Sequence, residues 1–488
     1  MPFTLRGDDV CQPTPPTPIS NPYWVAFSAS AARLIHLELG PVGLPKDPDW
    51  LALLAGNQLN VGELAFSNPI STAYSGHQFG SWAGQLGDGR AILLGDINQL
   101  ELQLKGAGKT HYSRMGDGRA VLRSSIREFL CSEAMHALGI PTSRALSVVG
   151  SKQRVIRETV ETAAVCSRIA PSFIRVGHFE HFASLQNIVR LKELADLLIN
   201  EFYPECRNTK DPYLSLFKEI SARNAKLVAQ WQSVGFCHGV LNSDNISALG
   251  LTIDYGPFGF LDHFEIDHIC NHSDHGGRYA YHRQPQIMHW NMACLASAVL
   301  PLLELEHSQE ESQALLRSAL EEFPVTYAKE WQKIFRSKLG FQLEQDGDIE
   351  IIERLLQAMN DSKVDFTTFF RNLSNTRKDS KLTDLAQRDE FIDRDNIDQW
   401  FSDYIHRLQS EVLSDEARKT MMNQINPKYI LRNHLAQAAI EKAQQDDFSE
   451  IEQLQLILSK PFDEQEPFEA YAKPPPVDMQ RIEVSCSS

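Results

Sequence analysis

The chain has 488 residues, which is enough for two or three units with buried cores. Its hydrophobic share of 42% is ordinary for a globular protein, and its net charge of −16 argues against general binding to nucleic acid or anionic membranes. Eight cysteines without C-x-x-C spacing favour a reduced, cytoplasmic protein. We find no secretory signal and no apolar run of about 18 residues, so we expect no membrane span.

The first 180 residues predict a β-rich unit that carries one long helix. Residues 99–105 alternate between apolar and polar side chains, so leucines face a core while Glu101, Gln103 and Lys105 face the other side. Residues 118–139 carry an apolar stripe of helical period and predict the helix. Further strands are expected over short apolar runs: 91–94, 145–149, 154–159 and 163–170.

Beyond residue 180 the chain predicts mainly helices. Asp211 and Pro212 suit the N-cap and first position of a helix that runs to Gly235. We therefore expect an N-terminal unit at 1–180, a helical unit at 181–470 and a proline-containing tail at 471–488. Further helices are predicted at 290–306, 311–340, 350–372, 397–414 and 430–458.

Residues 236–256 have the pattern of a kinase catalytic loop followed by a metal-binding turn. The position of the usual catalytic aspartate holds Val240, which cannot accept a proton, and a carboxylate appears instead at Asp244. Asn245 and Asp254 offer the oxygen ligands that Mg²⁺ prefers, and residues 251–253 predict a short buried strand that ends on Asp254. An Asn-Ser-Asp-Asn run also forms ordinary turns.

Lys105 and Glu128 match a second feature of kinases, a strand lysine that is held by a helix glutamate and contacts the triphosphate. Taken alone, both would be surface charges, but the loop at 238–254 favours the pairing. Arg168 and Arg175 would either form ion pairs at an interface or grip a terminal phosphate.

Two glycine-containing segments are candidate phosphate loops. Gly87, Gly89 and Arg90 offer backbone N–H groups and a guanidinium, although Asp-Gly is also a common hairpin turn. Asp117 and Gly118 open the predicted helix of Glu128, so its first amides could bind an anion, with Asp117 as a plain cap in the alternative.

Two further patterns carry less weight. Residues 106–110 resemble the end of a P-loop, but the earlier glycine of that motif is replaced by Gln103. The spacing of a histidine-rich stretch matches no closed zinc site, and its place after Asp254 is that of a kinase activation segment. Its candidate ligands are His263, His268, Cys270, His272 and His275.

The motifs at 74–80, 104–108, 116–130 and 238–245, with the terminal Ser-Cys-Ser-Ser, resemble the selenoprotein O family over nearly the whole chain. Cys486 stands where eukaryotic relatives carry selenocysteine, so the chain resembles a bacterial, cysteine-containing member. The resemblance implies an α+β, protein-kinase-like bilobal fold with a β-rich N-lobe, a large helical C-lobe and a C-terminal tail.

The resemblance also implies an activity, in which AMP passes from ATP to Ser, Thr or Tyr hydroxyls of protein substrates. The nucleotide would lie flipped relative to a kinase, with its α-phosphate facing the acceptor. Asp244 would be the catalytic base, Asn245 and Asp254 would hold Mg²⁺ or Mn²⁺, and Glu128 would orient Lys105. The ATP-binding residues would be Gly87, Gly89, Arg90, Lys105, Asp117, Gly118, Arg168, Arg175 and Asp254.

Family resemblance further implies redox regulation through Cys270 and Cys486, with two unpaired thiols as the alternative. A γ-phosphate-transferring protein kinase and an inactive nucleotide-binding scaffold remain alternatives to AMP transfer, and UTP remains an alternative to ATP. The expected partners are protein substrates and ATP, without nucleic acid or membrane, for a monomer in the cytoplasm.

Overall fold

The computed structural model describes residue 7 and residues 9–476, and the fold is α+β. The strands are β1 Cys11–Pro13, β2 Tyr23–Phe27, β3 Asn60–Val61, β4 Leu64–Ala65, β5 Ile70–Thr72, β6 Ser75–Gln78, β7 Ser81–Gln85, β8 Ala91–Ile97, β9 Leu100–Lys105, β10 Ala120–Val121, β11 Arg144–Ile156, β12 Val160–Ala170, β13 Phe236–Cys237 and β14 Gly259–Phe260.

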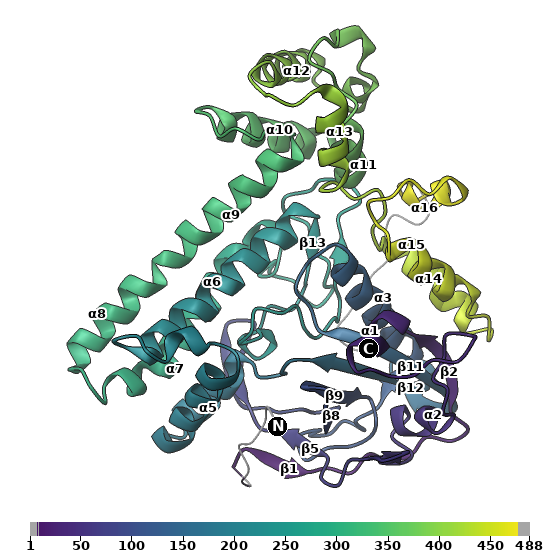
Figure 1. Ribbon diagram of the computed structural model, residues 1–488, viewed down its shortest axis with the longest axis vertical. Helices are drawn as coiled ribbons and strands as arrows, with labels where there is room; N and C mark the ends of the chain where they lie inside the picture. Colours follow the sequence, from purple (N-terminus) through teal and green to yellow (C-terminus); the bar gives the residue numbers. More distant parts are fainter. Residues whose placement is uncertain (1–6, 8, 477–488) are drawn as a thin grey trace.

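The helices follow mainly after the last long strand. They are α1 Ala29–Leu34, α2 Asp49–Leu54, α3 Leu122–Ala137, α4 Val176–Ser184, α5 Ile188–Glu201, α6 Pro212–Ser233, α7 Gln284–Leu303, α8 Gln309–Leu320, α9 Glu322–Lys338, α10 Asp348–Ser362, α11 Phe366–Leu373, α12 Arg394–Leu408, α13 Asp415–Asn423, α14 Asn433–Ala443, α15 Ser449–Leu458 and α16 Glu469–Ala472. Figure 1 shows the strands of the large sheet at one end of the long axis and α10–α13 at the other.

An eight-stranded antiparallel sheet forms the N-terminal part, with strand order β1-β5-β8-β9-β12-β11-β2 and β10 paired with β12. Leu102 and Leu104 of β9 pack into a core that contains residues of α1 and α2, as the alternation predicts. The opposite face of β9 is buried as well, since Glu101 and Gln103 are each 1% exposed. Glu101 accepts a hydrogen bond from the Phe173 N–H at 2.7 Å.

The helix predicted over 118–139 is shorter in the structure. It begins at Leu122, because Ala120 and Val121 pair with β12 as β10 and Gly118 lies in the left-handed region with φ +70°. The strand predicted at 145–149 and the first half of the one predicted at 154–159 belong to one irregular strand, β11, whereas residues 157–159 form the turn into β12.

The predicted long helices are interrupted in the structure. The stretch 350–372 divides at Lys363, with φ +51°, and the stretch 430–458 divides between α14 and α15, where Asp446 has φ +64°. Neither residue is a glycine or proline, so the sequence carries no breaker signal there. Residues 251–253 form no strand among the described residues, only one bridge between Thr142 and Thr252.

Helix α7 bears on the expectation that nothing spans a membrane. The stretch Tyr281–Leu303 is, within the described part of the chain, the one helix long and apolar enough to cross a bilayer by length and composition. Of its most apolar window, 56% is buried inside the protein, as in the core helix of a globular protein.

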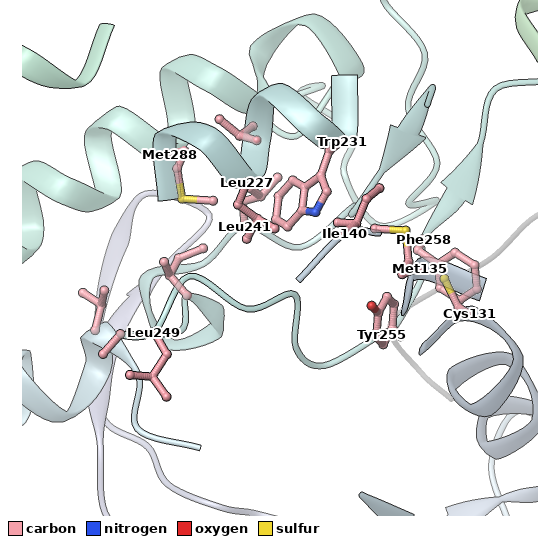
Figure 2. Close-up of a cluster of buried hydrophobic side chains, with 14 of the residues drawn as sticks. Cys131, Met135, Ile140, Leu227, Trp231, Leu241, Leu249, Tyr255, Phe258 and Met288 are labelled. Carbon is pink, nitrogen blue, oxygen red and sulfur yellow. The ribbon is translucent and has the colours of Figure 1, made fainter. Parts of the chain in front are cut away.

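The largest buried cluster joins α3 to the C-terminal helices and to the predicted catalytic segment (Figure 2). It includes Met135 of α3, Trp231 of α6 and Phe258. The Trp231 ring stacks on His238, and its indole N–H donates to Thr252 Oγ1 at 2.9 Å. The core therefore holds both ends of the 238–254 segment in place.

Candidate functional site

A cleft of about 660 Å³ lies between the sheet and the 238–257 segment. Seven basic and four acidic side chains line it, so its local charge is positive although the whole chain carries −16. A positively charged, concave site favours a polyanionic ligand. The charged lining residues are Arg90, Lys105, Arg114, Arg119, Arg157, Arg168, Arg175, Asp88, Asp117, Asp244 and Asp254.

Lys105 and Glu128 meet in this cleft. Lys105 Nζ lies 2.8 Å from Glu128 Oε2, and the two side chains are 10% and 4% exposed. β9 brings the lysine and α3 brings the glutamate, as the sequence predicts. Arg168 adds a second cation to Glu128, with Nη1 2.8 Å from Oε1, so the carboxylate is held from both sides.

Asp254 is surrounded by cations. Its Oδ1 accepts from Arg168 at 2.6 Å and lies 3.4 Å from Lys105 Nζ, and its Oδ2 accepts from Arg175 at 2.6 Å. Burial alone would raise the pKa of Asp254, but the charges of Arg175, Lys105 and Arg168 outweigh it and hold the pKa well below its usual range. Both arginines therefore form ion pairs with the predicted metal ligand.

Asp244 and Asn245 lie on a short 3-10 turn, Ser243–Asn245. Asp244 is 5% exposed, and its Oδ2 accepts from Gln78 Nε2 at 3.2 Å. Its Oδ1 is buried and has no hydrogen-bond partner among the described residues. Burial raises the pKa of Asp244 to about 6, against the opposing effects of Gln78 and Arg175. Asn245 Nδ2 donates to the Val240 carbonyl at 3.2 Å.

Close backbone packing sets the position of Asp244. A Cβ at Gly177, in the first turn of α4, would lie 2.5 Å from Ser75 O and 3.2 Å from Asp244 Cα. A Cβ at Gly76 would lie 3.0 Å from Asp244 Cβ. Because both positions lack a side chain, β6 and α4 can press directly against the turn.

The glycine-rich segment contributes in two different ways. Gly89 and Arg90 line the cleft, whereas a Cβ at Gly87 would lie 2.4 Å from the Tyr112 ring. Gly87 has φ +143°, so it serves the path of the loop and its packing on Tyr112. Asp88 between them points inward and accepts from the Thr72 N–H at 2.9 Å.

Asp117 and Gly118 also line the cleft, but they do not open α3. The expectation that these two residues form the helix N-terminus, and bind an anion or cap the helix there, is therefore wrong. Asp117 instead accepts from the Arg119 N–H at 2.9 Å and pairs with Arg157 at 2.9 Å. A Cβ at Gly118 would lie 2.1 Å from Gly108 O, so only glycine fits there.

The weaker patterns are not supported by the fold. No helix follows residues 106–110 within the described segment up to Val121, which excludes a P-loop. Within residues 9–476, the histidine-rich stretch forms no group of three converging ligand atoms. Cys270 is buried, and its Sγ donates to the Cys237 carbonyl at 3.3 Å. Cys486 lies outside the described residues.

Sequence reasoning missed several side chains of this site. Gln78 bonds to Asp244, Arg157 holds Asp117, and Asp88 anchors the glycine-rich loop. Gln78 lies in the motif at 74–80, so the motif was a usable signal. Arg157 lies in a turn of ordinary composition, and nothing near it indicates its role.

The donor atoms in the cleft fit a hard divalent cation. Asn245 offers an amide oxygen, Asp254 a carboxylate, and Asp244 a buried oxygen with no partner in the described structure. Mg²⁺ and Mn²⁺ take such oxygen ligands and need few of them from protein when phosphates supply the rest.

Comparison with known proteins gives full-length relatives. The family model described as protein adenylyltransferase SelO matches residues 31–459. The chain is 52% identical over 498 residues to the protein nucleotidyltransferase YdiU of Burkholderia lata, covering 100% of this chain and 95% of that protein. The Burkholderia multivorans YdiU gives the same identity and coverage. For Burkholderia pseudomallei YdiU, the identity is 52% over 485 residues, with 97% and 92% coverage.

Proposed function

Because the chain belongs to the SelO family of protein adenylyltransferases and is a nucleotidyltransferase, we propose that it transfers AMP from ATP to Ser, Thr or Tyr hydroxyls of protein substrates. The observation that carries this proposal is the cleft in which Asp244, Asn245 and Asp254 lie with Lys105 and the arginines. We infer a protein-kinase-like bilobal arrangement, with an N-lobe at 1–180, a C-lobe at 181–470 and a tail at 471–488.

The phosphates of ATP would take the place of Asp254 as acceptors for the buried arginines. Arg168 and Arg175 are each about 1–2% exposed, and a buried guanidinium needs an anionic partner. Phosphate oxygens match the guanidinium fork better than a single shared carboxylate. This exchange would free Asp254, while Lys105 keeps its contact with Glu128. Gly89, Arg90, Asp117 and Gly118 would line the rest of the nucleotide site, and Gly87 would shape its loop.

Asn245 and Asp254 would hold Mg²⁺ or Mn²⁺. When bound, the ion would neutralise negative charge on the phosphates and so stabilise the transition state.

Asp244 would act as the general base through its unpartnered Oδ1. The acceptor hydroxyl gives its proton to this oxygen while the hydroxyl oxygen bonds to the α-phosphorus. The bond between that phosphorus and the bridging oxygen breaks, and pyrophosphate leaves. A pKa of about 6 lets the carboxylate be ionised at neutral pH and still accept a proton effectively.

The cell context remains a proposal as well. We infer a cytoplasmic monomer that acts on protein partners and ATP, or UTP, without nucleic acid or membrane. A disulfide between Cys270 and Cys486 would regulate the activity in response to redox conditions. Cys270 is buried, and burial raises the pKa of its thiol well above the usual range, so the tail would have to reach a shielded sulfur.

Parallel reactions with α-³²P-ATP and γ-³²P-ATP test the proposal. Label on protein from the α-position alone supports AMP transfer. Label from the γ-position alone would make the protein a kinase, and no label with bound nucleotide would make it a scaffold. Asp244→Asn should lose the label, whereas Asp361→Asn, at an exposed position of α10, should keep it.

A further inference from the structure

A second group of metal-ligand side chains lies behind the catalytic turn and has no part in the proposed reaction. It consists of His77 of β6, Glu180 of α4 and Cys294 of α7, whose ligand atoms all lie within 4.8 Å of one another. His77 belongs to the motif at 74–80, and AMP transfer supplies no role for its side chain. The three residues come from segments about a hundred residues apart, so the fold itself brings them together.

Glu180 is the buried centre of this group. Its side chain is 4% exposed, and Oε1 lies 2.6 Å from His77 Nδ1. Oε2 is buried without a hydrogen-bond partner of good geometry among the described residues. Burial raises the pKa of Glu180, and the Ser243 hydroxyl and His77 oppose that rise. Ser243 is a poorly aligned partner, and a buried carboxylate oxygen without a well-aligned hydrogen bond is costly unless a ligand uses it.

His77 is held in a fixed orientation and is open to solvent on one side. Its ring meets Trp82 edge-on at 5.1 Å and Trp290 at 5.2 Å between centroids. Its side chain is 27% exposed, which leaves an entry path. Without a metal, burial raises the pKa of Cys294 to about 12, with Glu180 adding to that rise and Arg278 opposing it.

We propose that His77, Glu180 and Cys294 bind a borderline-soft transition-metal ion of the zinc class, at a site separate from the nucleotide's own cation. Imidazole, carboxylate and thiolate are zinc ligands, whereas Mg²⁺ takes oxygen alone. Tetrahedral zinc bonds of about 2.0–2.3 Å place ligand atoms about 3.3–3.8 Å apart. Pairs near the 4.8 Å limit would have to close by about 1 Å, whereas the 2.6 Å contact between His77 and Glu180 would have to open by about 0.7 Å. Cys294 loses its thiol proton to solvent on binding, and water fills the fourth position.

The ion restrains β6, the strand that contacts the turn of Ser243 and Asp244. The His77 N–H donates to Ser243 Oγ at 2.8 Å, and the next residue, Gln78, bonds to Asp244. A bond from the metal to β6, α4 and α7 at once therefore restrains the strand that holds Asp244. This inference concerns a structural ion and does not depend on which phosphate is transferred.

Cobalt titration of the full-length chain tests the site. Any affinity tag is removed first, and a chelator then strips bound metal from the protein. We expect a thiolate-to-cobalt charge-transfer band in the near ultraviolet that saturates at one Co²⁺ per chain. Zn²⁺ should abolish the band, and excess Mg²⁺ should not. Absence of the band in folded wild-type protein would overturn the proposal.

Variants identify the ligands. Cys294→Ser should lose the band, and Glu180→Gln should weaken cobalt binding at least tenfold, which we measure by chelator competition. Cys206→Ser, a buried cysteine elsewhere in the core, should keep the band, and so should Asp254→Asn at the nucleotide site. Far-ultraviolet circular dichroism confirms folding of each variant. A band that persists in Cys294→Ser, or disappears in Asp254→Asn, would refute a separate site.

Should Cys294→Ser fail to fold, the wild-type protein still decides the matter. Its thermal midpoint should rise on adding one equivalent of Zn²⁺, and this rise should disappear in Glu180→Gln. An equal rise in both proteins would place the zinc elsewhere.

Discussion

Replacing Asp244 by asparagine should abolish transfer and stabilise the protein at neutral pH. The carboxyl group is 5% exposed, and burial raises its pKa from an ordinary 3.8 to about 6. Because the pKa is higher in the folded than in the unfolded chain, ionisation costs the folded state free energy. The cost is complete above about pH 6 and disappears below the unfolded pKa. At about 1.36 kcal/mol per pKa unit, it reaches about 3 kcal/mol.

Urea unfolding of both proteins at pH 5 and pH 8 measures this cost. About half of it is already present at pH 5, so wild type should lose about 1–2 kcal/mol relative to the variant between the two pH values. This double difference cancels any pH-independent effect of the new amide. Asp348→Asn is the matched control, a buried aspartate 2.6 Å from Arg407 Nε. It should instead destabilise by about 1–3 kcal/mol, because Arg407 loses one of its two buried carboxylate partners and keeps Glu411. A pH-independent difference between wild type and Asp244→Asn would refute the reasoning.

The remaining predictions concern activity. Asp254→Ala should abolish AMP transfer and Mg²⁺-dependent ATP binding by calorimetry, and full activity would remove it from the metal role. Glu128→Gln should lower kcat/KM for ATP at least tenfold, because it removes the 2.8 Å partner of the strand lysine, whereas Glu133→Gln on the same helix should have a much smaller effect. The kcat/KM of the wild type should fall about tenfold per pH unit below about pH 6, as Asp244 is protonated; a flat profile from pH 5 to 8 would contradict its role as base. Cys486→Ser should make activity insensitive to reductant, and unchanged dependence would exclude the tail thiol.

The sequence predicted correctly those helices and strands whose residues follow a local pattern, such as apolar alternation or a helix start signal. The alternation at 99–105 and the Asp211-Pro212 start of α6 both correspond to observed elements. The predicted boundaries failed where the backbone was set by distant contacts. α3 begins at Leu122 because the two residues before it pair with β12, and α10 ends at Ser362, before Lys363, without any breaker residue. The polar face of β9 was expected to lie opposite the core, but Glu101 and Gln103 are buried there as well, with Phe173 and Arg168 as their partners.

The predicted site shows the same division. The loop at 238–254 and the lysine–glutamate pair were identifiable because their spacing follows from strands, turns and helices of known period. Arg168 and Arg175 left two possibilities open, and the ion pairs with Asp254 became visible only in the folded chain. The role of Gln78 beside Asp244 depends on a β6 contact across 166 residues.

The order of chemical groups along this chain was enough by itself to identify the family, the candidate catalytic turn and the residues worth testing, because such motifs are short and their geometry is local. Only the tertiary structure decided which charged side chains are buried together, away from water. Arg168 and Arg175 reach Asp254 across 86 and 79 residues, and His77 reaches Glu180 across 103. The strength of these pairs and the pKa of Asp244 depend on the removal of water by packing, and no local sequence pattern encodes that removal.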